Sequence, residues 1–442
     1  MNTFAWRLTL AATALMALVM GSRSAFGLFV SPLNTATGIG LAGISLAAAI
    51  AQLGLGFGQP LVGRLAERHG ATRVIRAGAW LLAGSTAAVV LADSAALLAL
   101  VLCAGALAGA AVGSNALLVG EIGRRLPEAQ RGLAIGIVGA GGSAGQLLLS
   151  PATQWTIDAH GWVVAMLATA LLLLLAWPLA GAFRGTAPAA DTAPARADAA
   201  TLRDALLQAR FWRIAVAFGV CGFHIGFLSM HMPGVIERCG LPASLSGTWL
   251  AVLGAANIAG SIGVGFALRR WQPAPLLVGL FTVRAVSVAA LLVLPPTADV
   301  LLGFAVVAGL SYMAVLPPIS QLLGRHFGVQ RLGTLFGIVM LVHQVGSFAG
   351  IWLGGWAAAT TGSDRLLWQV DIALAMLAVA LLWPRGVAAM PSSFRAAVPL
   401  LRTACGQART WIRRAAARVR CRPAVAPPRP GAPIPDFSGA RP

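Results

Sequence analysis

The stretch 183-FRGTAPAADTAPARADAATLRDALLQAR-210 is the longest polar segment before the C-terminal tail. On each side of it lie about 180 residues that are almost uninterruptedly apolar. A polar, Pro-containing stretch of this kind is typical of a surface linker between domains. It therefore predicts a linker at 183–210 that joins two membrane-embedded domains, 1–182 and 211–384.

The two apolar halves carry matching motifs. Residues 130–138 read QRGLAIGIV, and residues 330–339 read QRLGTLFGIV, at an offset of about 200 residues. An offset of this size corresponds to one half of the chain. Two halves duplicated around a central loop are typical of a secondary transporter.

The composition indicates an integral membrane protein. Of 442 residues, 58% are hydrophobic and only 10% are charged, whereas about a quarter of the residues of a soluble domain are charged. No nucleotide-binding loop, metal-ligand cluster or catalytic triad is found, and the five cysteines show no ligand spacing. We therefore expect neither an enzyme, nor a cofactor, nor a metal site.

The apolar segments predict an all-α protein with twelve transmembrane helices in two six-helix bundles. Each segment is long enough to cross a bilayer, for which about 20 apolar residues are needed. The predicted spans are 8–30, 41–65, 74–92, 95–120, 132–153, 162–182, 211–235, 245–268, 275–294, 299–322, 333–359 and 366–384.

The arginines are divided unevenly between the loops. Every second loop is rich in arginine, while the opposite loops hold only Arg238 and Arg365. Since positive residues accumulate in cytoplasmic loops, both termini are predicted to be cytoplasmic, which requires an even number of spans. The tail, 385–442, carries eleven arginines and one aspartate. We expect it to bind anionic lipid headgroups and not nucleic acid, through an interfacial helix at 400–421, with disorder at 423–442.

The loop after the second predicted span reads 63-GRLAERHGATR-73. It resembles the loop signature of the major facilitator superfamily, with glutamate where that family has aspartate. The resemblance implies two pseudo-symmetric bundles that work by alternating access, in which this loop stabilises one of the states. We expect a monomer. The motif residues that carry this role are Gly63, Glu67, Arg68, Gly70 and Arg73.

Two further segments resemble one branch of this family. The runs 21-GSRSAFGLF-29 and 221-CGFHIGFLSMHMP-233, with Asn257 and His343, resemble bacterial members of the monocarboxylate transporter and oxalate–formate exchanger branch. This resemblance implies a small organic anion as the substrate and the bacterial inner membrane as the location.

Charged residues within the predicted spans are few. Arg23 and Arg284 are the only arginines placed well inside spans, away from the span ends, and the carboxylates Glu121, Glu237 and Asp371 all lie toward span ends. A charge inside the bilayer is costly, so such arginines are candidate functional groups. Guanidinium groups without a competing carboxylate predict an anion site. Two alternatives are that Arg23 snorkels to the interface and that Arg284 pairs with polar groups of neighbouring helices.

With no buried carboxylate expected, proton coupling is assigned to histidines, which titrate near neutral pH. His224 and His231 are seven residues apart and share one helix face, and His343 lies in the eleventh span. The alternative for each is a buried packing residue.

Three uncharged polar residues complete the candidate substrate site. Tyr312, the only tyrosine, lies near the middle of the tenth span, and Asn115 and Asn257 lie in the fourth and eighth. In the family, the fourth and tenth spans line the central cavity. Interhelical hydrogen bonding is the alternative role for the two asparagines.

The function predicted from the sequence is secondary transport of a small, monocarboxylate-like organic anion together with protons. A second possibility is export of a drug or of a secreted metabolite such as a siderophore, although the fourth span lacks the arginine usual in proton-coupled drug antiporters. A third, a substrate sensor, would need a larger soluble domain than this chain offers.

Overall fold

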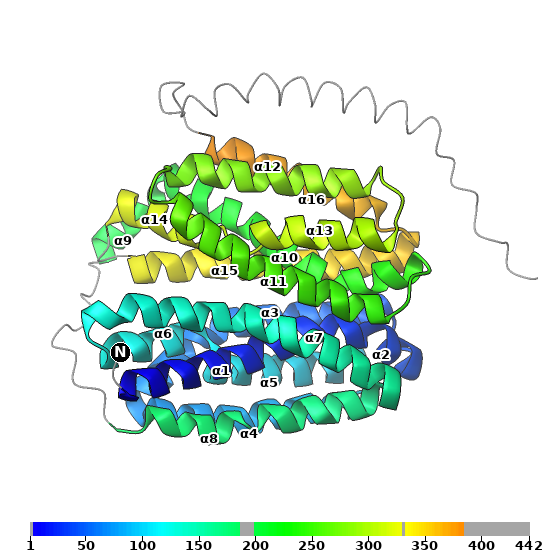
Figure 1. Ribbon diagram of the computed structural model, residues 1–442, viewed down its shortest axis with the longest axis horizontal. Helices are drawn as coiled ribbons and strands as arrows, with labels where there is room; N and C mark the ends of the chain where they lie inside the picture. Colours follow the sequence, from blue (N-terminus) through cyan, green and yellow to red (C-terminus); the bar gives the residue numbers. More distant parts are fainter. Residues whose placement is uncertain (1–2, 186–198, 329–331, 384–442) are drawn as a thin grey trace, which may run out of the picture. The chain divides into compact units, whose positions relative to one another are not determined.

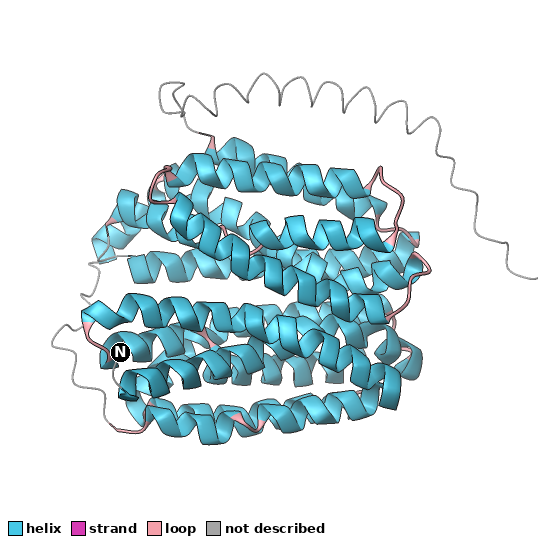
Figure 2. Cartoon of the chain, in the orientation of Figure 1, coloured by secondary structure: helices cyan, strands magenta, loops and turns pink. Residues whose placement is uncertain are grey.

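The computed structural model describes residues 3–185, 199–328 and 332–383, and this part of the chain is helical apart from short loops (Figure 2). The helices are α1 Thr3–Ala25, η1 Phe26–Phe29, α2 Val30–Thr37, α3 Leu41–His69, α4 Ala71–Ala88, η2 Val89–Leu91, α5 Ala95–Gly113, α6 Asn115–Arg125, α7 Glu128–Leu173, α8 Ala176–Leu179, η3 Ala180–Phe183, α9 Ala199–Leu207, α10 Ala209–Arg238, α11 Ser244–Ala267, α12 Pro273–Leu291, α13 Ala298–Ser311, α14 Leu316–Phe327, α15 Leu332–Thr361 and α16 Arg365–Leu382.

Eleven helical segments of the described residues are long and apolar enough to cross a membrane. The longest, Glu128–Phe183, is interrupted at Gly161, whose φ of 83° and ψ of 163° lie outside the helical region. Only glycine adopts such a backbone without strain, and the chain turns back at this end of the bundle (Figure 1). Its two arms, before and after Gly161, correspond to the predicted spans 132–153 and 162–182.

The spans form two helical bundles (Figure 1). Helices α1 and α3 to α8 pack around one hydrophobic core, and α10 to α16 pack around a second, larger one. Across the interface, α3 lies along α15 and α7 lies along α11. All-α architecture in two pseudo-symmetric bundles is therefore confirmed.

The pseudo-symmetry is visible in the tightest helix pairs, α1 with α7 and α10 with α15. Glycine makes each approach possible. A Cβ on Gly141 would come within 2.9 Å of the Thr13 Cγ2 atom, and one on Gly226 within 2.7 Å of the Ser347 carbonyl oxygen. Small residues at such crossings are the usual means of packing helices in lipid.

The fourth and tenth spans are both broken near their middle. The fourth is divided at Ser114 into α5 and α6, and the tenth is divided between Tyr312 and Val315 into α13 and α14. The two breaks are about 200 residues apart, as are the two matching sequence motifs. Helix breaks at membrane depth are tolerated where protein groups satisfy the freed backbone.

The two bundles touch along one half of their interface only. A Cβ on Gly254 of α11 would come within 3.0 Å of the Ser143 carbonyl oxygen of α7, and one on Gly56 of α3 within 3.2 Å of the Gln344 side chain of α15. Gly136 and Gly265 lie on the same helix faces as Ser143 and Gly254 but nearer the other ends of α7 and α11. A Cβ on either would meet nothing within 4 Å. The bundles are thus closed on the side away from the arginine-rich loops and separated on the side of those loops.

The described part of the predicted linker contains a helix that the sequence analysis did not anticipate, α9 at Ala199–Leu207. The tail, with its predicted interfacial helix at 400–421 and disorder at 423–442, lies outside the described residues.

The arginine distribution makes a topological prediction. Reporter fusions at Pro188 in the linker and at Ala424 in the tail are expected to report the cytoplasm, because positive loops are retained there. A fusion at Asp93, between η2 and α5, serves as the control and should report the opposite side. A fusion at Ala424 that reports the same side as Asp93 would contradict the even number of spans.

Candidate functional site

The break in the tenth span follows from Pro317 and Pro318, which have no backbone N–H and cannot continue a helix from the preceding turn. Side chains of neighbouring helices form hydrogen bonds with the freed backbone groups. Arg284 of α12 donates to the carbonyl oxygens of Ser311 and Tyr312, the latter at 2.6 Å. The Asn257 Oδ1 atom of α11 accepts from the Met313 N–H at 2.9 Å.

Arg284 is only 1% exposed and is held entirely within the C-terminal bundle. Besides the two carbonyls, its Nε–H donates to the Ser311 hydroxyl at 3.4 Å, and its guanidinium lies 5.3 Å from the centre of the Phe281 ring. Two carbonyl oxygens at a helix C-terminus are a favourable partner for a cation. These contacts favour the alternative that the sequence left open, in which Arg284 bonds polar groups of a neighbouring helix.

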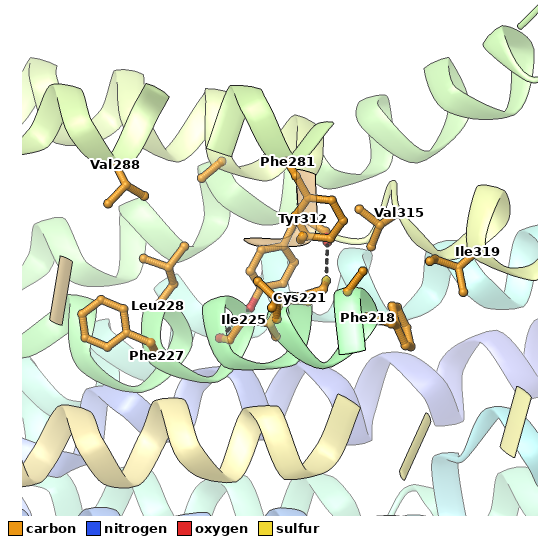
Figure 3. Close-up of a cluster of buried hydrophobic side chains, with 14 of the residues drawn as sticks. Phe218, Cys221, Ile225, Phe227, Leu228, Phe281, Val288, Tyr312, Val315 and Ile319 are labelled. Atoms are coloured by element: carbon orange, nitrogen blue, oxygen red, sulfur yellow. Dashed lines mark hydrogen bonds between the residues drawn. The ribbon is translucent and has the colours of Figure 1, made fainter. Parts of the chain in front are cut away.

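Tyr312 is buried at the C-terminal end of α13, and its side chain is directed at α10 (Figure 3). Its hydroxyl shares a hydrogen bond with the Ser229 hydroxyl and donates to the Ile225 carbonyl oxygen at 3.3 Å. The Cys221 thiol donates to the Tyr312 carbonyl oxygen at 3.7 Å. The tyrosine therefore joins the broken tenth span to the middle of α10.

Arg23 lies in the last turn of α1, half-buried, and donates to the side-chain oxygen of Gln52 on α3. It also interacts electrostatically with Tyr312 and His343 of the other bundle. No carboxylate forms an ion pair with it in the described residues. Arg23 is thus a cation of the N-terminal bundle that faces polar groups of the C-terminal bundle.

The two asparagine candidates lie in different surroundings. Asn115 is exposed at the first turn of α6, where the Ser114 hydroxyl caps the helix by accepting from the Leu117 N–H at 3.3 Å. Asn257 is buried, and its side-chain N–H donates to the Ser143 hydroxyl of α7 at 2.7 Å. Asn257 therefore links the two bundles and also accepts from the Met313 N–H at the break in the tenth span.

The expectation that no carboxylate is buried in the membrane-spanning part was wrong. Asp371 is 1% exposed, and its Oδ2 atom lies 2.6 Å from the Nδ1 atom of His224, halfway along α10. Glu121, in α6, is also buried. The distance of a residue from the start of an apolar segment measures its position along that helix. Which neighbouring side chain reaches it is decided by tertiary packing.

The three histidines have separate partners. His224 bonds Asp371 of α16, whereas His231 lies 2.8 Å from the Ile351 carbonyl oxygen of α15. His343 packs against the Phe218 ring, with the ring centres 4.6 Å apart. The shared helix face of His224 and His231 thus leads to two different contacts. Only His224 has a carboxylate partner.

The loop motif lies at the arginine-rich end of the N-terminal bundle. Gly70 joins α3 to α4 with a φ of 83°, which explains why glycine occupies that position. Glu67 is 63% exposed and lies 3.9 Å from the Arg124 guanidinium, a separation at which an exposed ion pair is worth about 0–1 kcal/mol. Of the other motif residues, Gly63 has no neighbour within 4 Å of a built Cβ. Arg68 and Arg73 are exposed.

The stronger pairing at this end involves Glu121, which the sequence analysis did not select. Its carboxylate accepts from Arg124 and, at 2.6 Å, from the Nε–H of Arg125. Arg125 also donates to the carbonyl oxygens of Phe183 and Gly185, at 2.9 and 3.1 Å, where the linker begins. This pairing could have been predicted from the sequence, because Arg124 and Arg125 follow Glu121 by three and four residues on one helix.

Replacement of Glu67 by alanine is expected to slow transport about tenfold or more while leaving substrate affinity nearly unchanged. In this structure the bundles are separated on the side of Glu67, and Glu67 has no strong partner there. We therefore expect Glu67 to act in the other state of the transport cycle, in which that side is closed. Binding and initial rates measured on the same reconstituted protein check this. A loss of affinity with an unchanged maximal rate would contradict it.

The sequence matches the family described as Major Facilitator Superfamily over residues 12–351. An uncharacterized transporter of this type, YcxA of Bacillus subtilis (strain 168), is 26% identical over 251 residues, or 52% of this chain and 58% of that protein. Monocarboxylate transporter 11 of Mus musculus is 28% identical over 319 residues, 69% of this chain and 70% of that protein. Monocarboxylate transporter 13 of Rattus norvegicus is 25% identical over 363 residues, 81% and 83% of the two chains.

Solved structures show the same fold. The D-xylose-proton symporter superposes with a TM-score of 0.70 at 15% identity, over 86% of this chain and 98% of that one. The nucleoside transporter NupG gives a TM-score of 0.69 at 12% identity, over 87% and 100% of the two chains. With this fold, and with a family match that covers most of its length, the chain is a membrane transporter that belongs to the major facilitator superfamily.

Proposed function

We propose that the protein carries a small organic monoanion across the membrane together with a proton, by alternating access between its two bundles. Arg23 is the observation that carries this proposal. It is a half-buried cation of one bundle that faces Tyr312 and His343 of the other, without an ion-pair partner in the described residues. A guanidinium in such a place is suited to bidentate pairing with a carboxylate.

Two further observations support an anion. The second cation in the spans, Arg284, is bonded to backbone carbonyls and does not compete for the substrate. Two of the relatives, at 25% and 28% identity, are named monocarboxylate transporters. Tyr312 and Asn115 remain candidate polar contacts for the substrate in this proposal, whereas the contacts of Asn257 favour an interhelical role.

The one-sided contact of the bundles supports alternating access. The interface is closed around Gly254 and Gly56, away from the arginine-rich loops. If those loops are cytoplasmic, as the positive-inside rule predicts, the structure is the inward-open state. The proposed location is a bacterial inner membrane, with both termini in the cytoplasm, and the loop motif would act when that side closes.

Uptake of a panel of radiolabelled carboxylates into proteoliposomes, with and without a pH gradient, tests the proposal. A monocarboxylate should accumulate when the source side is acidic, and neutral amides of the same shape should not compete with it. Export of bulky neutral or cationic compounds, with no carboxylate uptake in either direction, would favour the second reading as a drug or metabolite exporter.

A further inference from the structure

The contact between α10 and α16 holds a histidine and a carboxylate in the interior of the C-terminal bundle. The His224 Nδ1 atom lies 2.6 Å from the Asp371 Oδ2 atom, and the two side chains are each 2% exposed. The remaining polar atoms of the pair, His224 Nε2 and Asp371 Oδ1, are buried without a partner in the described part of the chain. Buried polar atoms nearly always form hydrogen bonds in folded proteins, so two atoms of one pair without a hydrogen-bond partner are unusual.

We propose that His224 and Asp371 form a proton-binding pair that changes between a charge of −1 and a charge of zero during transport. This inference rests on the proposed proton coupling and adds Asp371 as the second member of the site. A carboxylate accepts and does not donate, so the Nδ1–H of the ring donates to Oδ2. The free Nε2 atom then binds the incoming proton, which gives an imidazolium beside a carboxylate.

The protonated pair is the form better suited to its surroundings. An isolated buried carboxylate is costly in a low-dielectric interior, and the cost falls when an adjacent group becomes positive. When the bundles reorient and water reaches one side, the deprotonated form becomes accessible. The pair therefore has two states whose relative population depends on solvent access, as a coupling site requires.

In the described residues, no other charged side chain of the surrounding helices is bonded to the pair. On α10 itself, Cys221 and His231 are the buried titratable neighbours; α15 contributes His343, and α12 contributes Arg284. From α13 comes the end residue Tyr312, and from α1 comes Arg23. Helices α2, η1 and α11 contribute no titratable side chain, and the charged residues of α9 and α14 lie in or near their last turns.

A physical connection runs from the pair to the broken tenth span. Asp371 interacts electrostatically with Cys221, which stands three residues before His224. The Cys221 thiol donates to the Tyr312 carbonyl oxygen, which also accepts from Arg284 at 2.6 Å. A change in the charge of the pair therefore alters the electrostatic environment of the carbonyl groups at the end of α13. Tyr312, at this position, interacts electrostatically with Arg23.

The charges of Arg23, the bound anion and the His224–Asp371 pair also balance. When the site binds one monoanion at Arg23 and one proton at the pair, the net charge of the loaded transporter equals that of the empty one. The anion alone would leave an uncompensated charge inside the bilayer, which opposes reorientation. Binding of the proton and of the anion should consequently favour each other, because linkage is reciprocal.

The first arm of the test needs no substrate. Histidine-selective ¹⁵N NMR of the full chain in lipid nanodiscs follows all six histidines, and the signal absent from His224→Gln identifies residue 224. That signal is expected to show the second ring proton as the pH is lowered, and this proton should require a lower pH in Asp371→Asn because the carboxylate favours the imidazolium. A His224 ring that keeps one protonation state at every pH at which the protein stays folded would overturn the inference.

The second arm uses radiolabelled lactate as the probe monocarboxylate. In His224→Gln and Asp371→Asn, lactate accumulation driven by a pH gradient should fall at least about tenfold, and the uptake that remains should no longer depend on the pH difference. The exposed His160→Gln variant is the matched control and should behave as the wild type in this assay. Loss of coupling in His231→Gln but not in His224→Gln would reject the pair. If no wild-type carboxylate uptake is found, the proposed function fails, while the NMR arm still decides the inference.

Discussion

Replacement of Arg23 by glutamine is expected to weaken binding of the carboxylate substrate by about 30-fold to about 4,000-fold. A partly desolvated, charge-assisted bond between a guanidinium and a carboxylate is worth roughly 2–5 kcal/mol, and every 1.4 kcal/mol corresponds to about a factor of ten. Arg23→Lys should restore little of the loss, since an ammonium group does not reproduce the planar pair of donors. Substrate binding to purified protein, measured by calorimetry, gives the affinities directly.

The matched control for Arg23 is Arg270→Gln. Arg270 is exposed at the end of α11, so its removal changes the total charge by the same amount without touching the centre. It should bind the carboxylate as tightly as the wild type. If Arg23→Gln reaches the membrane, is folded and binds the carboxylate normally, then Arg23 is a structural residue that bonds Gln52, and the anion proposal loses its main support.

Replacement of Gly254 by tryptophan is expected to abolish the closed half of the interface. A Cβ at this position would already come within 3.0 Å of both the Leu147 nitrogen and the Ser143 carbonyl oxygen of α7, and backbone atoms at that distance cannot yield as a flexible side chain can. The bundles must separate there to admit an indole. This separation also breaks the 2.7 Å bond between Asn257 and Ser143, so transport should fall by about tenfold or more.

Spin labels on Ala159 of α7 and Ser244 of α11, in a cysteine-free background, report the separation because both residues are exposed at the closed end. The Gly254→Trp protein should show a longer distance and a single population. Gly263→Trp, two and a half turns further along α11, is the control, since nothing lies within 4 Å of a Cβ built there. An unchanged distance in a folded Gly254→Trp protein would contradict the prediction, because the interface would then accommodate the indole without separation of α7 and α11.

Much of the fold could be predicted from the chain itself. Hydropathy and length alone place the spans, because a backbone in lipid must satisfy its hydrogen bonds within each helix. The position of α3, predicted at 41–65 and observed at Leu41–His69, is one example. The break in the tenth span was signalled by Pro317 and Pro318, and the turn before α4 by Gly70, since both effects are local to the backbone.

The partners of the polar side chains could not be predicted in the same way. Arg23 and Arg284 are both predicted to bind an anion, yet the structure places one beside Gln52 of α3 and the other against the carbonyls of Ser311 and Tyr312. Asp371 was set aside because it lies near the start of its span, yet it meets His224 halfway along α10. Periodicity and composition describe one helix at a time and determine which segments enter the membrane. Which charges are paired inside it depends on the rotation and depth of each helix against its neighbours, and only tertiary packing sets these.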